Sequence, residues 1–228
     1  NVSDHYFGLD ENYNFIDLDV MACGPVVADV SDGFNLFWNS AQAYPAAMLS
    51  KRAKPKHLAE ARAELTRQLI EERDGRLRAF SITPRDWSKE FAKLSRQMVK
   101  GRAQFLQDDP DPAHDDREVM AGLQTMTRNQ KGELILVSPY LIPSEGALER
   151  LASASDAGME VGILTPTLAA NNQAAAYGKY RKKRRSIVEG GVILYEMRHD
   201  PSEEVRAWVD TYPVRCKEVA LHLKAVVG

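Results

Sequence analysis

The sequence predicts an α/β protein of mixed α+β character, in which helices flank a largely parallel sheet. Helix-like and strand-like segments alternate regularly from Glu118 to Tyr195. The chain has 228 residues, 44% of them hydrophobic and 27% charged, which is ordinary for a globular protein with a substantial core. No apolar run approaches the roughly 20 residues that cross a bilayer, so we expect no membrane-spanning helix.

The first half of the chain predicts one strand followed by helices. Phe15 to Ala22 alternates apolar and acidic residues, as a half-buried strand does. The apolar positions of Val26 to Trp38 recur at helical spacing, and Lys56 to Arg73 is rich in strong helix formers. A further helix is expected to begin with Thr83 as its cap and Pro84 in its first turn.

An acidic loop separates the irregular part of the chain from the regular part. Residues 108–116 read DDPDPAHDD and contain two prolines, which excludes a regular element. A solvated loop and a metal site are the alternatives, and the lack of ligand spacing around a turn favours the loop. We place the boundary between two similar halves nearby, at residues 1–98 and 99–228.

The elements beyond this loop follow a regular order. Helices are expected at 118–128, 144–157 and 172–189, and strands at 133–137, 160–164 and 192–195. A terminal strand from Val219 to Val227 should join the same sheet.

Charge and cysteine content exclude several classes of protein. The net charge of -2 gives no bulk attraction to nucleic acid or anionic lipid. Any electrostatic attraction of such a partner must therefore come from local clusters of charged residues. The two cysteines, Cys23 and Cys216, are too few for a disulfide framework or a zinc site. The first residues lack a basic region followed by an apolar core, so no signal peptide is expected within this sequence.

His222 and Lys224 are the residues that best predict chemistry. They lie two apart in the apolar run LHLKAVVG, and strand alternation sends both side chains to one face. An imidazole can act as nucleophile or as acid and base, while an ammonium neutralises a phosphate. The alternative is an ordinary polar face of a strand.

A series of short segments matches a known family in order. Before LHLKAVVG come SPY with IP at 138–143, LTPTLA at 164–169 and GVILYE at 191–196. With NVSDHYFG and FIDLDV near the beginning, the series resembles the phospholipase D superfamily, most closely its bacterial cardiolipin synthase branch. Its members carry HxKxxxxD motifs, so we expect this chain to be an internal fragment that lacks the first motif and stops inside the second.

The resemblance implies a phospholipase D-like fold of two similar α/β halves, each giving one motif to a shared site. One histidine forms a phosphohistidine and the other transfers protons, without a metal or a cofactor. His222 would be the general acid/base, Lys224 a phosphate ligand and Asn1 another phosphate contact. Asp19 would orient a catalytic histidine, with Asp17 as the structural alternative. The fragment alone is expected to be inactive.

The densest charge cluster, Lys179 to Arg185, reads KYRKKRR. Helical spacing turns Arg184 inward, where it would be structural or close to the substrate. Lys182, Lys183 and Arg185 would meet lipid phosphates, and a solvated helix face is the alternative. We expect phospholipid substrates at a membrane surface and do not expect nucleic acid as a partner. The expected location is the cytoplasm or the periphery of the bacterial inner membrane.

Departures from the family leave the acceptor alcohol open. Tyr177 stands where relatives have His, Asn171 and Asn172 replace Thr-Asp, and His5 replaces an acid. The resemblance therefore implies a phosphatidyltransferase of the cardiolipin synthase type. The alternatives are a phospholipase D-like phosphodiesterase or nuclease that uses water, and a noncatalytic lipid-binding module.

Overall fold

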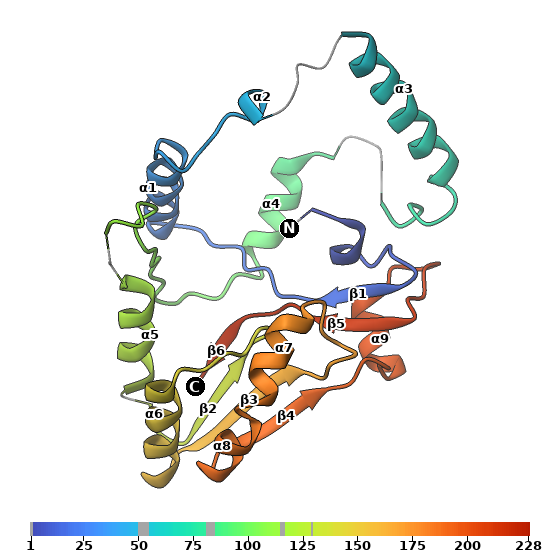
Figure 1. Cartoon of the computed structure of the whole chain (residues 1–228). Coiled ribbons are helices and arrows are strands. Elements are labelled where there is room, and N and C mark those ends of the chain that lie inside the picture. The colour runs from blue at the N-terminus through green and yellow to red at the C-terminus, as the bar shows by residue number, and fades with distance from the viewer. Residues whose placement is uncertain (1, 50–54, 81–84, 115–116, 129) are drawn as a thin grey trace. The chain divides into compact units, whose positions relative to one another are not determined.

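The computed structural model describes residues 2–49, 55–80, 85–114, 117–128 and 130–228 (Figure 1). The chain divides into two compact units. Residues 1–19 and 126–228 form the first, called here the sheet unit, and residues 20–125 form the second, called the helical unit.

The sheet unit brings the start of the chain together with its second half. Its elements, in order, are the 3-10 helix η1 (Asp4–Tyr6), β1 (Tyr13–Ile16), β2 (Glu133–Val137), α6 (Glu145–Asp156), β3 (Glu160–Pro166), α7 (Ala174–Arg181), α8 (Arg184–Glu189), β4 (Ile193–Met197), α9 (Glu203–Val209), β5 (Glu218–Leu221) and β6 (Ala225–Val227).

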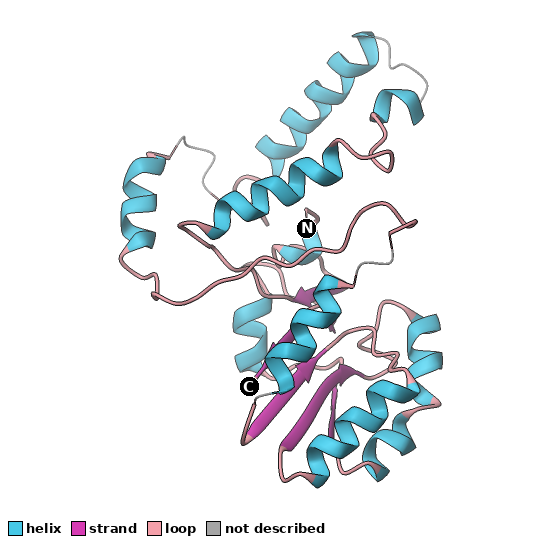
Figure 2. Cartoon of the chain, turned by 90° about the vertical axis from the view of Figure 1, so that its left-hand side faces the viewer, coloured by secondary structure: helices cyan, strands magenta, loops and turns pink. Residues whose placement is uncertain are grey.

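The described strands form two sheets (Figure 2). The large sheet has the order β4-β3-β2-β6, in which β2, β3 and β4 are parallel and β6 runs antiparallel to β2. The small sheet pairs β1 with β5 in parallel, with Ile16 opposite Leu221. The predicted fold class is confirmed, because helices flank sheets of mostly parallel strands.

Local signals explain where the helices begin and the strands resume. Ser144 and Ser202 accept hydrogen bonds through their hydroxyls from the backbone N–H groups of Ala147 and Val205, and so cap α6 and α9. Gly158 has a φ of 90°, a value that favours glycine in the turn between α6 and β3.

The main core lies between the large sheet and helices α6, α7 and α8 (Figure 1). Its buried residues are Leu148, Val161, Ile163, Tyr180, Ile187 and Val192. A smaller core joins α9 to the small sheet through Val209, Cys216 and Val219, with Ile16 packed against them. Both cores fix the strands whose ends carry the candidate site.

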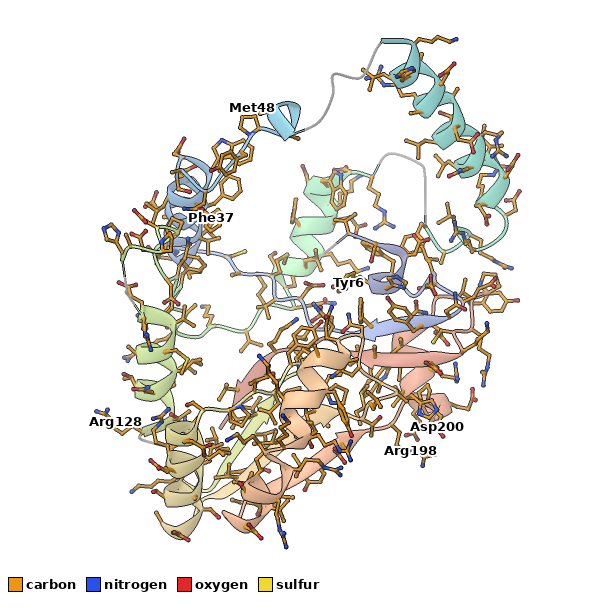
Figure 3. All side chains as sticks on the ribbon, in the orientation of Figure 1. Tyr6, Phe37, Met48, Arg128, Arg198 and Asp200 are labelled. Atoms are coloured by element: carbon orange, nitrogen blue, oxygen red, sulfur yellow. The ribbon has the colours of Figure 1, made fainter. Side chains whose placement is uncertain are left out.

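The helical unit contains α1 (Val26–Trp38), α2 (Ala46–Leu49), α3 (Pro55–Glu72), α4 (Trp87–Ser95) and most of α5 (Glu118–Arg128). Among the residues described there, α1, α4 and α5 contain no buried residue. Phe37 and Met48 are exposed examples (Figure 3). Within the described ranges, no helix combines the length and apolarity needed to cross a membrane.

The described part of the acidic loop, residues 108–114, contains no helix or strand. His114 Nδ1 lies 3.2 Å from Asp109 Oδ2. No group of three or more potential metal ligands occurs among the residues that the structure describes. The proposed division into halves at residues 98 and 99 remains a prediction.

Several predicted elements differ in extent from the observed ones. The strand predicted at Phe15 to Ala22 ends at Ile16, because the Ile16 carbonyl accepts the N–H groups of His222 and Leu223 and closes the ladder there. The helix predicted at 172–189 is two helices, α7 and α8, since Lys183 N–H turns back to the Tyr180 carbonyl between them.

The predicted terminal strand, Val219 to Val227, is also interrupted. Residues 222–224 separate β5 in the small sheet from β6 in the large sheet, so the prediction of one strand in one sheet was wrong. Helix α9 was not predicted. The predicted helix start at Thr83 and Pro84 lies outside the described residues.

Candidate active site

His222 and Lys224 lie in the short connection between β5 and β6. Because β1 and β5 are parallel, their carboxyl ends meet at one edge of the small sheet, where sites of α/β proteins gather. The Ile16 carbonyl fixes this edge by accepting from the His222 N–H at 2.9 Å and the Leu223 N–H at 3.0 Å. The backbone at the histidine is therefore tied directly to the end of β1.

Asp17 orients the His222 ring. Its Oδ2 lies 2.8 Å from His222 Nδ1, and the two side chains are only 18% and 16% exposed. Burial acts to raise the pKa of Asp17, but hydrogen bonds from His222 and from the Leu18 N–H outweigh it and leave that pKa below its usual value. An ionised Asp17 accepts a hydrogen bond from Nδ1–H, which keeps the proton on Nδ1 and leaves Nε2 as the reactive nitrogen.

Lys224 also contacts the His222 ring. Its Nζ lies 2.9 Å from His222 Nε2 and 3.1 Å from Nδ1. Desolvation lowers the pKa of Lys224, and the negative charge of Asp17 opposes that shift. A reactive imidazole nitrogen thus lies beside a cation that can hold the oxygens of a phosphodiester.

Aromatic rings surround the histidine. The ring centroids of Phe15, Tyr6 and Tyr140 lie 4.9, 5.3 and 6.2 Å from that of His222. The Tyr6 hydroxyl, carried by η1 (Figure 3), lies 3.4 Å from each ring nitrogen. Burial, followed by the charge of Asp17, raises the pKa of Tyr6, so its hydroxyl keeps its proton and can donate.

A buried polar network holds β1 and β5 in place behind the histidine. Asn14 is fully buried; its amide donates to Asp210 Oδ1 at 3.0 Å and accepts from the Asp10 N–H at 3.1 Å. Arg206 donates to Asp210 Oδ2 at 3.3 Å and to the Cys216 carbonyl at 2.6 Å. The network connects β1, α9 and the segment that enters β5, and so fixes the strands that end at Asp17 and His222.

The structure brings together some of the predicted site residues. His222 and Lys224 are in contact, and the carboxylate at the ring belongs to Asp17, the structural alternative. Asp19 is exposed, and among the described residues it has no recorded interaction with the histidine. Asn1 lies outside the described residues.

Arg184 has a carboxylate partner on the large sheet. Its guanidinium pairs with Glu196 Oε2, while Tyr180 donates its hydroxyl to Glu196 Oε1 at 2.8 Å. This ion pair joins α8 to β4, and the hydrogen bond to Glu196 satisfies the buried Tyr180. The prediction that Arg184 faces inward was wrong, because the residue is exposed and meets its carboxylate at the surface. A substrate contact for Arg184 stays a prediction.

Within the basic run, some cations are already paired. Lys183 pairs with Glu145, and Arg185 Nε lies 2.9 Å from Glu189 Oε1. Within the described residues, no ion pair is recorded for the remaining cations, which are exposed on and just beyond α7: Lys179, Arg181 and Lys182.

Sequence reasoning assigned no role to the aromatic rings or the Asn14 network. Tyr6 falls in the segment NVSDHYFG, whose resemblance to the family was the available signal. Asn14 and Phe15 carried no signal beyond strand alternation. The partner of Asn14 is Asp210 and that of Phe15 is His222, and both lie about 200 residues away in the chain.

Sequence comparison finds cardiolipin synthases among the relatives. Cardiolipin synthase C of Escherichia coli is 25% identical over 250 residues, which cover 100% of this chain and 46% of that protein. Cardiolipin synthase A of Buchnera aphidicola is 34% identical over 74 residues, or 32% of this chain and 15% of that protein. An uncharacterised protein of Helicobacter pylori is 25% identical over 202 residues, 88% of this chain and 40% of its own length.

The chain spans less than half the length of each of these relatives. No family model matches the sequence, and the search of solved structures found no match. The chain is similar in sequence along its whole length to a bacterial cardiolipin synthase, and its helix-flanked sheets are consistent with a phospholipase D-like fold.

Proposed function

We propose that this chain is part of a phosphatidyltransferase of the cardiolipin synthase type, which acts on phospholipid phosphodiesters through a phosphohistidine. The observation that carries the proposal is the contact of one imidazole with both a carboxylate and an ammonium, in Asp17, His222 and Lys224. The similarity to cardiolipin synthases C and A supports the same chemistry.

In the proposed first step, a second histidine attacks phosphorus, so a P–N bond forms and the P–O bond to the departing alcohol breaks. His222, protonated on both ring nitrogens, gives the proton on Nε2 to that alcohol, while its Nδ1 proton stays on the ring and is hydrogen-bonded to Asp17. Lys224 neutralises the charge on the phosphoryl oxygens. In the second step the acceptor alcohol returns a proton to Nε2, its oxygen attacks phosphorus, and the P–N bond breaks.

The second histidine and lysine are proposed to come from a longer protein that contains this chain. The chain aligns with only 46% of cardiolipin synthase C, which leaves room for a second pair in such a protein. The 228 residues by themselves are expected to bind phosphodiesters without turning them over.

Lys179, Arg181 and Lys182 are proposed to contact anionic phospholipid head groups. They are exposed, whereas Lys183 and Arg185 already have carboxylate partners. Each cation near an anionic membrane contributes about 1 kcal/mol of attraction. Such a patch suits a protein that works at the inner membrane surface, where its substrates lie.

The test compares the longer protein with its His222→Ala and Lys224→Ala variants on phosphatidylglycerol vesicles. We expect cardiolipin and glycerol from the unaltered protein, with loss of turnover in both variants. His57→Ala, an exposed histidine on α3, is the matched control and should keep full activity. Full activity of His222→Ala would exclude the proposed role of this histidine.

The products separate the alternatives. Phosphatidic acid as the sole lipid product, released together with glycerol, would indicate hydrolysis with water, and cleavage of single-stranded DNA would indicate a nuclease. Binding without turnover by a longer protein in which both pairs are intact would indicate a lipid-binding module. Mass spectrometry of an acid-labile phosphatidyl group on histidine should detect the covalent intermediate when the reaction is quenched.

A further inference from the structure

Tyr140 lies over the amine of Lys224 at the end of β2. The Lys224 Nζ is 5.5 Å from the centroid of the tyrosine ring, within the range of a cation–π contact. The same ring meets that of His222 edge to face, at 6.2 Å and 76°. One aromatic side chain therefore contacts both members of the histidine and lysine pair.

Two consecutive asparagines hold the residues on which this ring depends. The Tyr140 hydroxyl donates to Asn172 Oδ1 at 3.0 Å, and Asn171 Nδ2 donates to the Pro139 carbonyl at 3.1 Å. Beneath them, the buried Thr165 donates to the Ser138 carbonyl at 2.9 Å. The end of β2 is thus fixed at three successive residues, and the position of the ring follows from it.

We propose that Tyr140, anchored by Asn172, is a positioning residue that holds the Lys224 ammonium beside His222. The inference rests on the proposed function, in which the Lys224 ammonium binds the phosphate of the substrate. A lysine stem has four rotatable bonds and loses considerable rotamer entropy when it is held in one place. The ring face supplies the attraction that favours the one position from which Nζ reaches Nε2.

The anchor is neutral, and this matters for the charge of the site. Asn172 fixes the tyrosine through an amide oxygen. A carboxylate at this position would add negative charge near the ammonium and compete with the phosphate for it. The uncharged Asn172 leaves the positive charge of Lys224 available to the substrate.

Nuclear magnetic resonance on the 228-residue chain tests the contact without any activity. The ε-CH2 protons of Lys224, assigned with Lys224→Arg, should resonate upfield of those of other exposed lysines because they lie against the ring. Tyr140→Phe keeps the ring but loses the hydroxyl bond to Asn172, so it should reduce this shift, and Tyr140→Leu should abolish it. If Tyr140→Leu does not fold, Asn172→Ala changes only an exposed side chain and should reduce the shift. An ordinary lysine shift in the unaltered chain would overturn the proposal.

Kinetics of the longer protein test the consequence. Tyr140→Leu should lower kcat about tenfold with little change in KM, as expected for loss of a cation–π contact. Tyr140→Phe, which keeps the ring face but loses its bond to Asn172, should cause a smaller loss than Tyr140→Leu. In the Lys224→Ala background, assayed with an activated aryl phosphodiester, Tyr140→Leu should cause no further loss.

The outcomes distinguish the two proposals. Equal losses from Tyr140→Leu with and without Lys224 would mean that the ring does not act through the lysine, and the proposed function would stand. Full activity of Lys224→Ala would contradict the proposed function itself.

Discussion

Asp17 Oδ2 lies 2.8 Å from His222 Nδ1, although the two residues are 205 positions apart in the chain. Parallel pairing of β1 with β5 makes this contact possible, since it brings the residue after Ile16 beside the residue after Leu221. The imidazole is thereby fixed in one tautomer and one orientation before any substrate binds.

Replacement of this carboxylate should impair the proposed reaction selectively. Asp17→Asn preserves size but no longer holds the proton on Nδ1, so we expect kcat of the longer protein to fall by a factor on the order of 100 to 10,000. Asp19→Asn, the matched control on the exposed neighbour, should stay within about twofold. Nitrogen-15 spectra of His222 should show the change of tautomer. A larger loss from Asp19→Asn would reverse the assignment.

The alkaline limit of activity should reflect Lys224. Desolvation lowers the pKa of this lysine from its ordinary 10.5, so the required positive charge is lost as pH rises through a value below 10.5. The charge of Asp17 opposes the shift. Asp17→Asn should therefore move the alkaline limb of the kcat profile to still lower pH, and Asp19→Asn should leave it in place. An unchanged limb in Asp17→Asn would contradict the coupling.

The Asp210 network should dominate the stability of the small sheet. Asp210→Ala leaves the fully buried Asn14 and the largely buried Arg206 without this carboxylate, and we expect a loss of about 3 kcal/mol in the free energy of unfolding. Asp200→Ala removes an exposed pair with Arg198 (Figure 3) and should cost far less, because solvent screens exposed ion pairs. Urea denaturation of the chain measures both, and equal losses would show that the network does not stabilise the fold.

Binding to anionic vesicles should depend on the cations without carboxylate partners. A triple change of Lys179, Arg181 and Lys182 to Ala should weaken binding to phosphatidylglycerol vesicles by about 100-fold at low salt. The double change of Lys183 and Arg185, both paired in the structure, is the control and should weaken it much less. Vesicle sedimentation gives both affinities, and the reverse order would disprove the patch.

Local patterns predicted much of the second half of the chain. The bounds of α5 and β2 agree with the predicted 118–128 and 133–137, because caps, apolar periodicity and short loops all act within a few residues. The prediction was wrong at the terminal strand, since the break at residues 222–224 depends on pairing with β1, at the opposite end of the chain.

The candidate site was predictable only in part, for the same reason. His222 and Lys224 are neighbours in sequence, so spacing alone predicted that they would act together. The carboxylate was harder to choose, because Asp17 and Asp19 would share one face of an extended strand. The early end of β1 at Ile16 decides in favour of Asp17, and no pattern in the sequence indicates that end.

The passage from β5 to β6 sets a limit on engineering of this protein. His222 and Lys224 occupy a connection clamped at both ends, with Leu221 held in one ladder and Ala225 in another. A shift of either residue by one position would change the register of β5 with β1 or of β6 with β2 and break backbone hydrogen bonds there. Insertion or deletion of a single residue between 221 and 225 should therefore be far more damaging than any substitution at Leu223, so the length of this connection matters more than the side chain at its centre.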